Sequence, residues 1–341
     1  MSSPLPKLSY VLLSHNREKY IRAAIESAFA QDYEGELEYI FSDDCSTDRT
    51  YEIIKECVAE YKGTRRVVVT QTPRNMHLAG NTNHAVQFVE SDWIIRADDD
   101  DISTPDRCTI IGKAIAANPG CSYLYTKMIR FEDIQESEIL ASSHKHRSFV
   151  ESTTINVLDG VHNMWTQFSE PGILHQAWSA KHFKIFGDLP LDGYWVDDVI
   201  ANMRCCAIGS GVYINAVTAY IRWNAGNMSQ GGADGSRDYH SIMRLEEFHD
   251  NYFNKTFRPL KHTFRKVKEY LELQETEAPL FIASIQAELE KRERLCSFWR
   301  KGTINRIRIS KELGHKGIFS ALRCLPMPIF AFLLCIYRRL K

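Results

Sequence analysis

The stretch WIIRADDDD, residues 93–101, decides the expected fold. Its first part, Trp93–Ala97, is mostly apolar and predicts a short buried strand. This strand runs directly into four adjacent aspartates, Asp98–Asp101. Adjacent carboxylates repel one another, and their oxygens are the ligands that Mg²⁺ and Mn²⁺ prefer. The run therefore indicates a divalent-metal site, with a solvated acidic loop or a helix N-terminal cap as the alternative.

Strand and helix patterns alternate on the N-terminal side of this run. Short apolar runs predict strands at 8–13, 37–41 and 66–70, and helical spacing of apolar residues predicts helices at about 20–29, 50–61 and 80–89. Such alternation predicts an α/β fold with a Rossmann-like, mainly parallel sheet flanked by helices. Further along, residues 123–129 resemble a strand, and residues 192–203 a loop leading into a helix.

Polar residues follow three of these strands at their carboxyl ends. Ser14–Arg17 follows the first strand, Asp43–Asp48 the second and Asp98–Asp101 the fourth. Ligands of doubly wound sheets bind at the carboxyl ends of the strands, so the sequence predicts a site there. In the second cluster, Ser, Thr and Asp are also common helix caps. A carboxylate of Asp43 or Asp44 can instead accept hydrogen bonds from a nucleobase or a ribose, and both interpretations stay open.

Composition narrows the function further. The 341 residues carry a net charge of -1, which argues against a general nucleic-acid binder. The nine cysteines are odd in number and show no CxxC spacing, which argues against a disulfide scaffold or a zinc ribbon. Residues 1–7 lack an apolar signal-peptide core, so we expect reduced thiols and a cytoplasmic location.

The C-terminal third changes character. Charged helical patterns predict a helical extension over residues 239–341, after a catalytic domain over residues 1–238. The apolar tail, residues 318–341, ends in basic residues and is too short for a confident membrane span. It is either an interfacial anchor, which would place the protein peripherally at the inner face of the membrane, or a tail packed on the extension.

The ordered motifs together resemble family 2 nucleotide-sugar glycosyltransferases of the GT-A fold. The resemblance covers roughly residues 7–230, and it is specific as a set although no single motif is. Its segments are Ser9–Arg17 with Tyr20-Ile21, Ile25–Tyr33, Ser42–Asp48, Leu78–Asn83, Ala97–Asp101 with Pro105–Arg107, and Trp195–Asp198. Two departures are Cys45, where the family has Gly or Asn, and Thr82, where Arg is frequent.

The resemblance implies roles for individual residues toward a nucleotide-sugar donor and a divalent metal, Mn²⁺ or Mg²⁺. Asp44 would contact the base, and Asp100 would be the principal metal ligand. Asp98 would face the ribose or share the metal, and Arg222 would bind the diphosphate. The remaining donor-site residues would be Ser14, Asn16, Arg17, Asp43, Asn83 and Asp99.

The resemblance also implies an inverting transfer with a carboxylate as general base. Asp198 is the expected base and Asp197 the second choice, whereas by position alone both are acidic residues favoured at a helix N-terminus. Asn224 stands where many family members have a His near the diphosphate or metal, and Ile221 replaces a Tyr. This replacement puts a third protein contact to the metal in question.

The expected protein is an inverting glycosyltransferase that moves a sugar, from a UDP-sugar donor, to a hydroxyl acceptor on a glycan or lipid carrier in cell-surface polysaccharide synthesis. One alternative is a sugar-phosphate nucleotidyltransferase, although that class needs a Gly-rich phosphate loop after the first strand. Another is a catalytically degenerate glycan-binding protein of the same fold.

Overall fold

The computed structural model describes residues 4–131, 152–155, 175–191, 197–222 and 261–274, and four single helical positions between 283 and 290. The chain divides into two compact units. The first comprises Met1–Trp223 with His262–Phe281, and the second comprises Asn224–Lys261 with Ile282–Lys341. Almost all described residues belong to the first unit, which contains the sheet.

Strands and helices alternate along the first unit. Their bounds are β1 Leu8–Ser14, α1 Ile21–Phe29, β2 Leu37–Asp43, α2 Thr50–Glu60, β3 Val67–Gln71, α3 His77–Val86, β4 Trp93–Asp98, β5 Ile102–Ser103, α4 Arg107–Ala117, β6 Cys121–Phe131, β7 Ser152–Ile155, β8 His175–Ser179, α7 Lys181–Phe186, α8 Asp197–Ile208 and β9 Ser210–Arg222.

The nine strands in the described part of the chain form one mixed sheet. Its order is β3-β2-β1-β4-β8-β6-β9-β5, with β7 paired to β9. The first four strands of this order are parallel, as the sequence predicts. Beyond β4 the sheet departs from the mainly parallel expectation, because β8 runs antiparallel to both β4 and β6. The parallel half therefore ends at β4, the strand that carries the aspartates.

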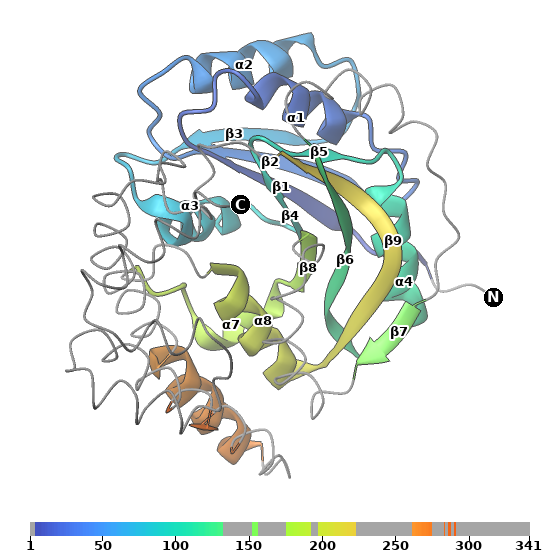
Figure 1. The fold of residues 1–341 in the computed structure, drawn as a ribbon, viewed down its shortest axis with the longest axis vertical. Coiled ribbons are helices and arrows are strands. Elements are labelled where there is room, and N and C mark those ends of the chain that lie inside the picture. The colour runs from blue at the N-terminus through green and yellow to red at the C-terminus, as the bar shows by residue number, and fades with distance from the viewer. Residues whose placement is uncertain are drawn as a thin grey trace, which may run out of the picture. The chain divides into compact units, whose positions relative to one another are not determined.

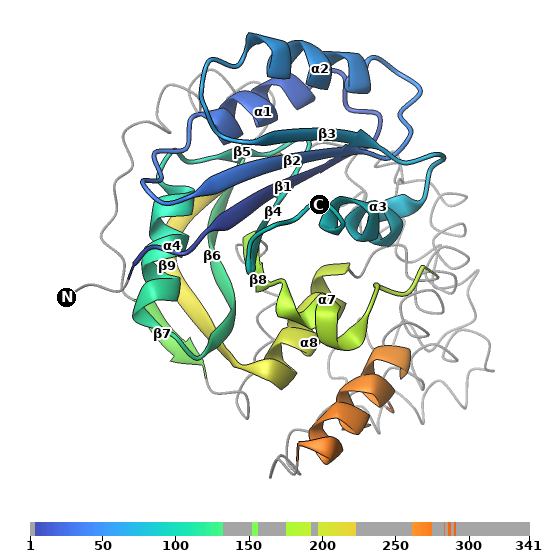
Figure 2. The same cartoon turned by 180° about the vertical axis from the view of Figure 1, so that it is seen from behind.

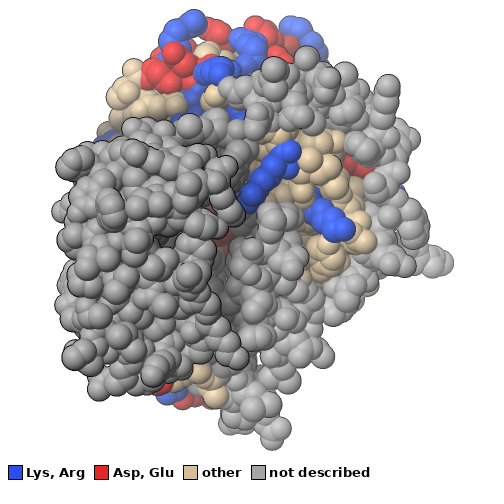
Figure 3. Space-filling view, in the orientation of Figure 1, with Lys and Arg blue, Asp and Glu red and all other residues tan. Residues whose placement is uncertain are grey.

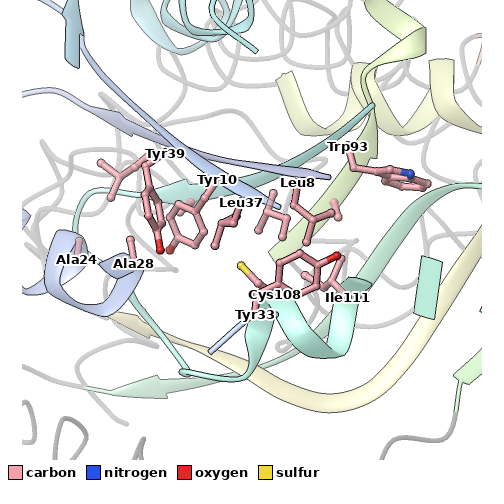
Figure 4. Close-up of a cluster of buried hydrophobic side chains, with 14 of the residues drawn as sticks. Leu8, Tyr10, Ala24, Ala28, Tyr33, Leu37, Tyr39, Trp93, Cys108 and Ile111 are labelled. Atoms are coloured by element: carbon pink, nitrogen blue, oxygen red, sulfur yellow. The ribbon is translucent and has the colours of Figure 1, made fainter. Parts of the chain in front are cut away.

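Helices cover both faces of the sheet (Figures 1 and 2). Helices α1, α2 and α4 share one hydrophobic core with alternate side chains of the central strands. In this core Tyr10 and Tyr39 lie on neighbouring strands and Ala24 and Ala28 on α1 (Figure 4). On the other face, α3 packs on β1 and β2, and α8 packs on β6, β8 and β9. Burial of each large side chain contributes about 1.5–3 kcal/mol, so this core fixes the sheet.

The outer surface of the α1–α2 layer is charged with both signs. Figure 3 shows Lys and Arg interspersed with Asp and Glu over these helices. Arg22 of α1 pairs with Glu56 and Glu60 of α2, and Arg49 also pairs with Glu56. These exposed ion pairs contribute little stability, about 0–1 kcal/mol each, and mark this layer as a solvated face.

Two elements, α3 and β6, have boundaries that differ from the prediction. Helix α3 begins at His77 rather than near residue 80, and Asn75 Oδ1 accepts a hydrogen bond from the His77 N–H. This contact satisfies a donor that a helix N-terminus leaves without an intrahelical partner. Helix α8 begins at Asp197, so both predicted catalytic aspartates lie in its first turn. A bulged β6, Cys121–Phe131, is longer than predicted because it pairs with β9 along its length.

The predicted C-terminal extension is described only in part. Residues 261–273 form a helix that packs on α7, with Tyr270 5.3 Å from Phe186 between ring centroids. The Lys266 ammonium donates to the Phe186 carbonyl at 3.0 Å. The predicted boundary at residue 238 and the tail 318–341 lie outside the described residues, so both stay predictions. No helix within the described ranges combines the length and apolarity needed to cross a membrane.

Three non-glycine residues with positive φ follow the first three strands. They are Asn16 with φ 53°, Cys45 with φ 55° and His77 with φ 60°. This left-handed region costs an L-residue roughly 1–2 kcal/mol, and Asn tolerates it better than most residues. The conformation of Cys45 gives a physical reason why Gly or Asn suits this position.

A buried histidine lies beneath α8. His182 of α7 is fully buried between Trp178 and Phe183, with ring centroids 6.1 Å and 4.0 Å away. Among the described residues, neither of its ring nitrogens has a hydrogen-bond partner. Burial, together with the nearby Arg204 guanidinium, lowers the pKa of His182 to about 3. The ring is therefore neutral in the folded protein.

His182 makes stability depend on pH. Because the folded pKa lies below the unfolded value of about 6.5, the unfolded chain binds the extra proton as the pH falls. The wild type should therefore lose up to about 1.4 kcal/mol of unfolding free energy per pH unit below about 6.5, relative to His182→Leu. Urea unfolding at several pH values measures this difference. His262→Leu, at an exposed position, is the control, and parallel pH profiles for wild type and His182→Leu would contradict the prediction.

The backbone at Cys45 predicts opposite effects of two substitutions. Cys45→Asn should raise the unfolding free energy by a few tenths to about 1 kcal/mol, whereas the β-branched Cys45→Val should lower it by at least about 1 kcal/mol. Chemical denaturation measures both. Cys121 is equally half-buried but lies in a strand, so Cys121→Val should be tolerated. A stability loss of the same size at both positions would refute the backbone explanation.

Candidate functional site at the ends of the parallel strands

The turn after β2 is shaped by Asp43. This residue is fully buried, and its Oδ1 accepts hydrogen bonds from Ser46 Oγ at 2.5 Å and Ser14 Oγ at 3.3 Å. Its Oδ2 accepts from the Ser46 N–H at 2.9 Å and Gln71 Nε2 at 2.8 Å. Ser14 and Asp43, two of the predicted donor-site residues, therefore connect the ends of β1, β2 and β3 through hydrogen bonds. Direct contact of either with a donor stays a prediction.

Asp44 joins the same turn to the loop after β3. Its Oδ1 accepts hydrogen bonds from Thr72 Oγ1 at 2.8 Å and from the Met76 N–H at 2.7 Å. Its own N–H donates to the Ser14 carbonyl at 2.8 Å, which extends the β1–β2 pairing by one residue. The carboxylate of Asp44 is thus held by one oxygen in a fixed orientation at the strand ends.

His15 connects three loops around this turn. Its N–H donates to Asp99 Oδ2 at 2.8 Å, and its ring Nδ1 lies 2.9 Å from the Asp44 carbonyl. Its Nε2 lies 3.0 Å from the Asn75 amide and 3.2 Å from the Asn16 amide. The tautomer that satisfies these contacts has Nε2 accepting from the amides and Nδ1–H donating to the backbone carbonyl of Asp44. His15 therefore connects the turn after β2 to the aspartate run.

Asn16 and Arg17, the next two predicted site residues, contact different parts of the site. Asn16 Oδ1 accepts the Thr47 N–H at 2.8 Å, and this contact ties it to the β2 turn. Arg17 turns toward the aspartates, with its Nε 3.6 Å from both Asp99 Oδ1 and Asp100 Oδ2. Arg17 supplies positive charge where the carboxylates gather.

The aspartate run concentrates negative charge at the end of β4. Burial raises the pKa values of Asp99, Asp100 and Asp101, and the neighbouring carboxylates raise them further. The pKa of Asp100 rises to about 7 and that of Asp101 to about 8, although nearby arginines oppose both shifts. A bound cation would reduce the repulsion between these carboxylates. Their oxygens are the kind of ligand that Mg²⁺ and Mn²⁺ prefer.

The described side chains do not by themselves form a complete set of ligands around one metal position. Across the described ranges, no group of three or more His, Cys, Asp or Glu side chains is arranged to hold a metal ion. Asp98 Oδ2 accepts a hydrogen bond from Arg96 Nη1 at 2.8 Å, and Asp101 Oδ1 accepts one from the Arg222 N–H at 2.9 Å. The predicted metal ligands Asp98 and Asp100 therefore stay predictions.

Arg222 lies behind the aspartates. It is 1% exposed, and its guanidinium stacks 4.4 Å from the Tyr20 ring centroid and 4.7 Å from that of Phe131. Its Nε donates to the Asp100 carbonyl at 3.0 Å. These contacts fix the backbone of the aspartate run, and the predicted contact of Arg222 with a diphosphate stays untested.

Asn83, another predicted donor contact, holds a loop instead. It is buried in α3, where its amide nitrogen donates to the Leu189 carbonyl at 2.9 Å and its amide oxygen accepts the Leu189 N–H at 2.8 Å. The pair fixes the segment between α7 and α8 against α3. Asn83 therefore has a structural role in these contacts, and its role toward a donor stays a prediction.

The two candidate catalytic aspartates have different environments. Asp197 is 2% exposed, and its Oδ2 accepts hydrogen bonds from Arg96 Nε at 3.0 Å and Thr82 Oγ1 at 3.4 Å. Asp198, the next residue of α8, is half-buried. Although burial opposes the charge of Arg96, Asp197 and Asp98 raise its pKa well above the ordinary value, and Asp198 adds to the effect. Arg96 therefore lies within electrostatic reach of both aspartates.

Sequence reasoning did not assign His15 or Arg96. His15 was within a recognised segment, but its three contacts join loops that are far apart in the chain. Arg96 gave a local signal, since it is the one charged residue between Trp93 and Ala97. A charged residue within a buried strand needs a partner, although the sequence does not show which one.

Several predicted elements cannot be placed. Asn224 and Trp195 lie outside the described residues. Ile221 lies in β9, next to Arg222.

Comparison with known proteins supports the resemblance found in the sequence. Residues 9–167 match the family model described as Glycosyl transferase family 2. The putative glycosyltransferase EpsE of Bacillus subtilis is 37% identical over 102 residues, which cover 30% of this chain and 36% of EpsE. The poly(ribitol-phosphate) beta-N-acetylglucosaminyltransferase TarS of Staphylococcus aureus is 32% identical over 97 residues, which cover 28% of this chain and 16% of TarS. These matches thus span about a third of the relatives or less.

Solved structures agree at the level of fold. The structure of S. aureus TarS residues 1–349 in complex with UDP-GlcNAc matches with a TM-score of 0.53 at 17% identity. That match covers 98% of this chain and 92% of the TarS chain. The mixed sheet with helices on both faces is accordingly a GT-A fold, and residues 9–167 are similar in sequence to glycosyl transferase family 2.

Proposed function

We propose that this protein transfers a sugar, with inversion, from a nucleoside-diphosphate sugar to a hydroxyl acceptor. The observation that carries the proposal is the meeting of four segments at one edge of the sheet. The loops after β1, β2 and β4 are joined through His15, and Arg96 joins the end of β4 to the first turn of α8. Donor-binding groups and candidate base thus lie on connected elements.

The donor would lie over the loops after β1 and β2. Asp44 would accept hydrogen bonds from the base, because its carboxylate is already oriented by Thr72 and Met76. Ser14, Asn16 and Asp43 would shape this part of the site through the turn contacts. TarS residues 1–349 have been crystallised with UDP and with UDP-GlcNAc, which supports a uridine nucleotide as the donor here.

The diphosphate would lie at the aspartate run. Asp100 and Asp98 would hold Mn²⁺ or Mg²⁺ together with diphosphate oxygens, with Asp99 beside them. The metal would neutralise negative charge on the departing nucleoside diphosphate. Arg17 would add positive charge on the same side, since its guanidinium already faces Asp99 and Asp100.

Asp198 is the proposed general base. The acceptor hydroxyl oxygen attacks the anomeric carbon, the bond from that carbon to the diphosphate oxygen breaks, and Asp198 takes the hydroxyl proton. A positioned base of this kind accelerates the reaction by typically about 10²- to 10⁴-fold. Asp197 is less suited, because it is buried and paired with Arg96.

The acceptor would be a glycan or a lipid-linked glycan in surface polysaccharide synthesis. This part rests on similarity to TarS, whose name describes a poly(ribitol-phosphate) acceptor, and to EpsE. Association of the basic, apolar tail at residues 318–341 with the inner membrane surface would suit such an acceptor.

The alternative functions make different demands. A nucleotidyltransferase would need a Gly-rich loop after β1, whereas residues 14–17 are Ser-His-Asn-Arg with side chains bonded to neighbouring loops. A degenerate glycan-binding protein would not need Asp198 beside an ion-paired Asp197. Neither alternative is favoured by these contacts.

Nucleotide-sugar turnover tests the proposal. Wild-type protein is incubated with a panel of UDP- and GDP-sugars and a polyol-phosphate acceptor, with Mn²⁺, Mg²⁺ or chelator. We expect metal-dependent nucleotide release from one donor. Asp198→Ala should lower kcat by about 10²- to 10⁴-fold with donor KM nearly unchanged, and Asp100→Ala should weaken donor binding and remove the metal response.

Asp92→Ala provides the matched control, because Asp92 precedes β4 at the opposite end of the strand and is exposed. Its turnover should equal that of the wild type. Wild-type rates in Asp198→Ala would exclude this residue as the base. Formation of nucleotide sugar from a nucleoside triphosphate and a sugar phosphate would instead establish the nucleotidyltransferase.

A further inference from the structure

Arg96 lies between the two halves of the proposed site. It belongs to β4, where its neighbours Ile95 and Ala97 face the core shared with α1 and α4. The side chain of Arg96 points to the opposite face and is 12% exposed. Asp98, two residues on, has the same orientation because side chains alternate along a strand.

The guanidinium of Arg96 contacts one carboxylate from each half. Its Nη1 is 2.8 Å from Asp98 Oδ2 on the aspartate run, and its Nε is 3.0 Å from Asp197 Oδ2 at the start of α8. Thr82 of α3 makes a second contact to the same Asp197 oxygen at 3.4 Å. The contacts of Arg96 therefore span 101 residues of sequence.

The backbone of Arg96 is itself fixed. Arg107 of α4 is fully buried, and its Nη2 donates to the Arg96 carbonyl at 2.6 Å. The Nη1 of Arg107 donates to Ser103 Oγ at 2.9 Å. Because the α1-side core holds Arg107, the position of the Arg96 guanidinium is set by the rigid part of the sheet rather than by a loop.

We propose that Arg96 is a positioning residue that fixes the first turn of α8, and thereby Asp198, relative to the aspartate run. The kinetic consequence of this inference rests on the proposed function. The structural part, that Arg96 fixes the first turn of α8, does not depend on it. Arg96 would not touch substrate. It would set the distance between the group that activates the acceptor and the groups that hold the donor diphosphate.

Arginine suits this task better than lysine would. A planar guanidinium can donate to two carboxylates through different nitrogens at fixed angles, whereas an ammonium is a single point charge on a flexible stem. Removal of the guanidinium would leave Asp197 buried without its charged partner, which is strongly unfavourable. The first turn of α8 would then move so that Asp197 regains solvent, and Asp198 would move with it.

Hydrogen exchange tests the positioning without reference to activity. In Arg96→Gln, the amides of residues 200–204 in α8 should exchange faster by on the order of tenfold or more. Arg65→Gln is the matched control, because Arg65 also donates from a half-buried position, to the Gln31 and Tyr33 carbonyls. That control should leave α8 unchanged. Unchanged α8 exchange in Arg96→Gln would overturn the inference.

Kinetics of three variants test the consequence. Arg96→Gln should lower kcat for transfer by about 10²-fold, the effect of a misplacement of about 1 Å, while donor KM changes only a few-fold. Arg96→Lys should recover part of this loss. The double variant Arg96→Gln/Asp197→Asn removes both charges, so it keeps the fold without a buried unpaired carboxylate, and its kcat should be no lower than that of Arg96→Gln.

The outcomes separate the inference from the proposed function. A kcat of the double variant clearly below that of Arg96→Gln, or a loss confined to KM, would overturn the positioning role. Faster α8 exchange in Arg96→Gln, with no turnover of any nucleotide sugar by the wild type, would support the positioning and reject the transferase.

Discussion

Parallel pairing of β1 with β2 on one side and with β4 on the other is the constraint on which the site depends. The register places Ser14 opposite Asp43, and Leu13 opposite both Ser42 and Asp98. Because the three strands point the same way, their polar carboxyl-terminal residues meet at one edge. The register is held by the core beneath it, since a slip of one residue would turn the apolar side chains away from α1 and α4.

Charge at this edge is balanced by arginines that come from distant parts of the chain. Arg17 faces two aspartates from the β1 loop, Arg222 supports the run from β9, and Arg96 reaches Asp197 of α8 from within β4. Each of these arginines contacts a different aspartate or group of aspartates. Burial raises the carboxyl pKa values of Asp100 and Asp101, and neighbouring aspartates raise them further, although these arginines oppose the shift. A bound cation would favour the ionised form of such crowded carboxylates, so the site suits a cation and a diphosphate, which is the chemistry proposed here.

Much of the site at this edge could be predicted from local sequence patterns. The contacts that could not be predicted involve residues far apart in the chain. The strand ends were predictable because apolar runs stop where polar residues begin, as at Asp98. The contacts of Asn83 were not predictable, because its partner Leu189 is 106 residues away. The same holds for Asp197, since its burial and its pairing with Arg96, 101 residues away, distinguish it from Asp198. The family resemblance favours Asp198 as the base, and the burial of Asp197 supports that proposal.

The sequence by itself determined the alternation of strands and helices, the parallel half of the sheet and the gathering of acidic loops at its edge. These features depend on periodicity and on short-range order, which a linear chain displays directly. Only the tertiary structure decided that β8 reverses the sheet after β4, that Arg222 stacks behind the aspartates and that Arg96 joins them to α8. Those features depend on which distant side chains become neighbours once the core has formed, because burial gives each charged group the partner that water would otherwise supply.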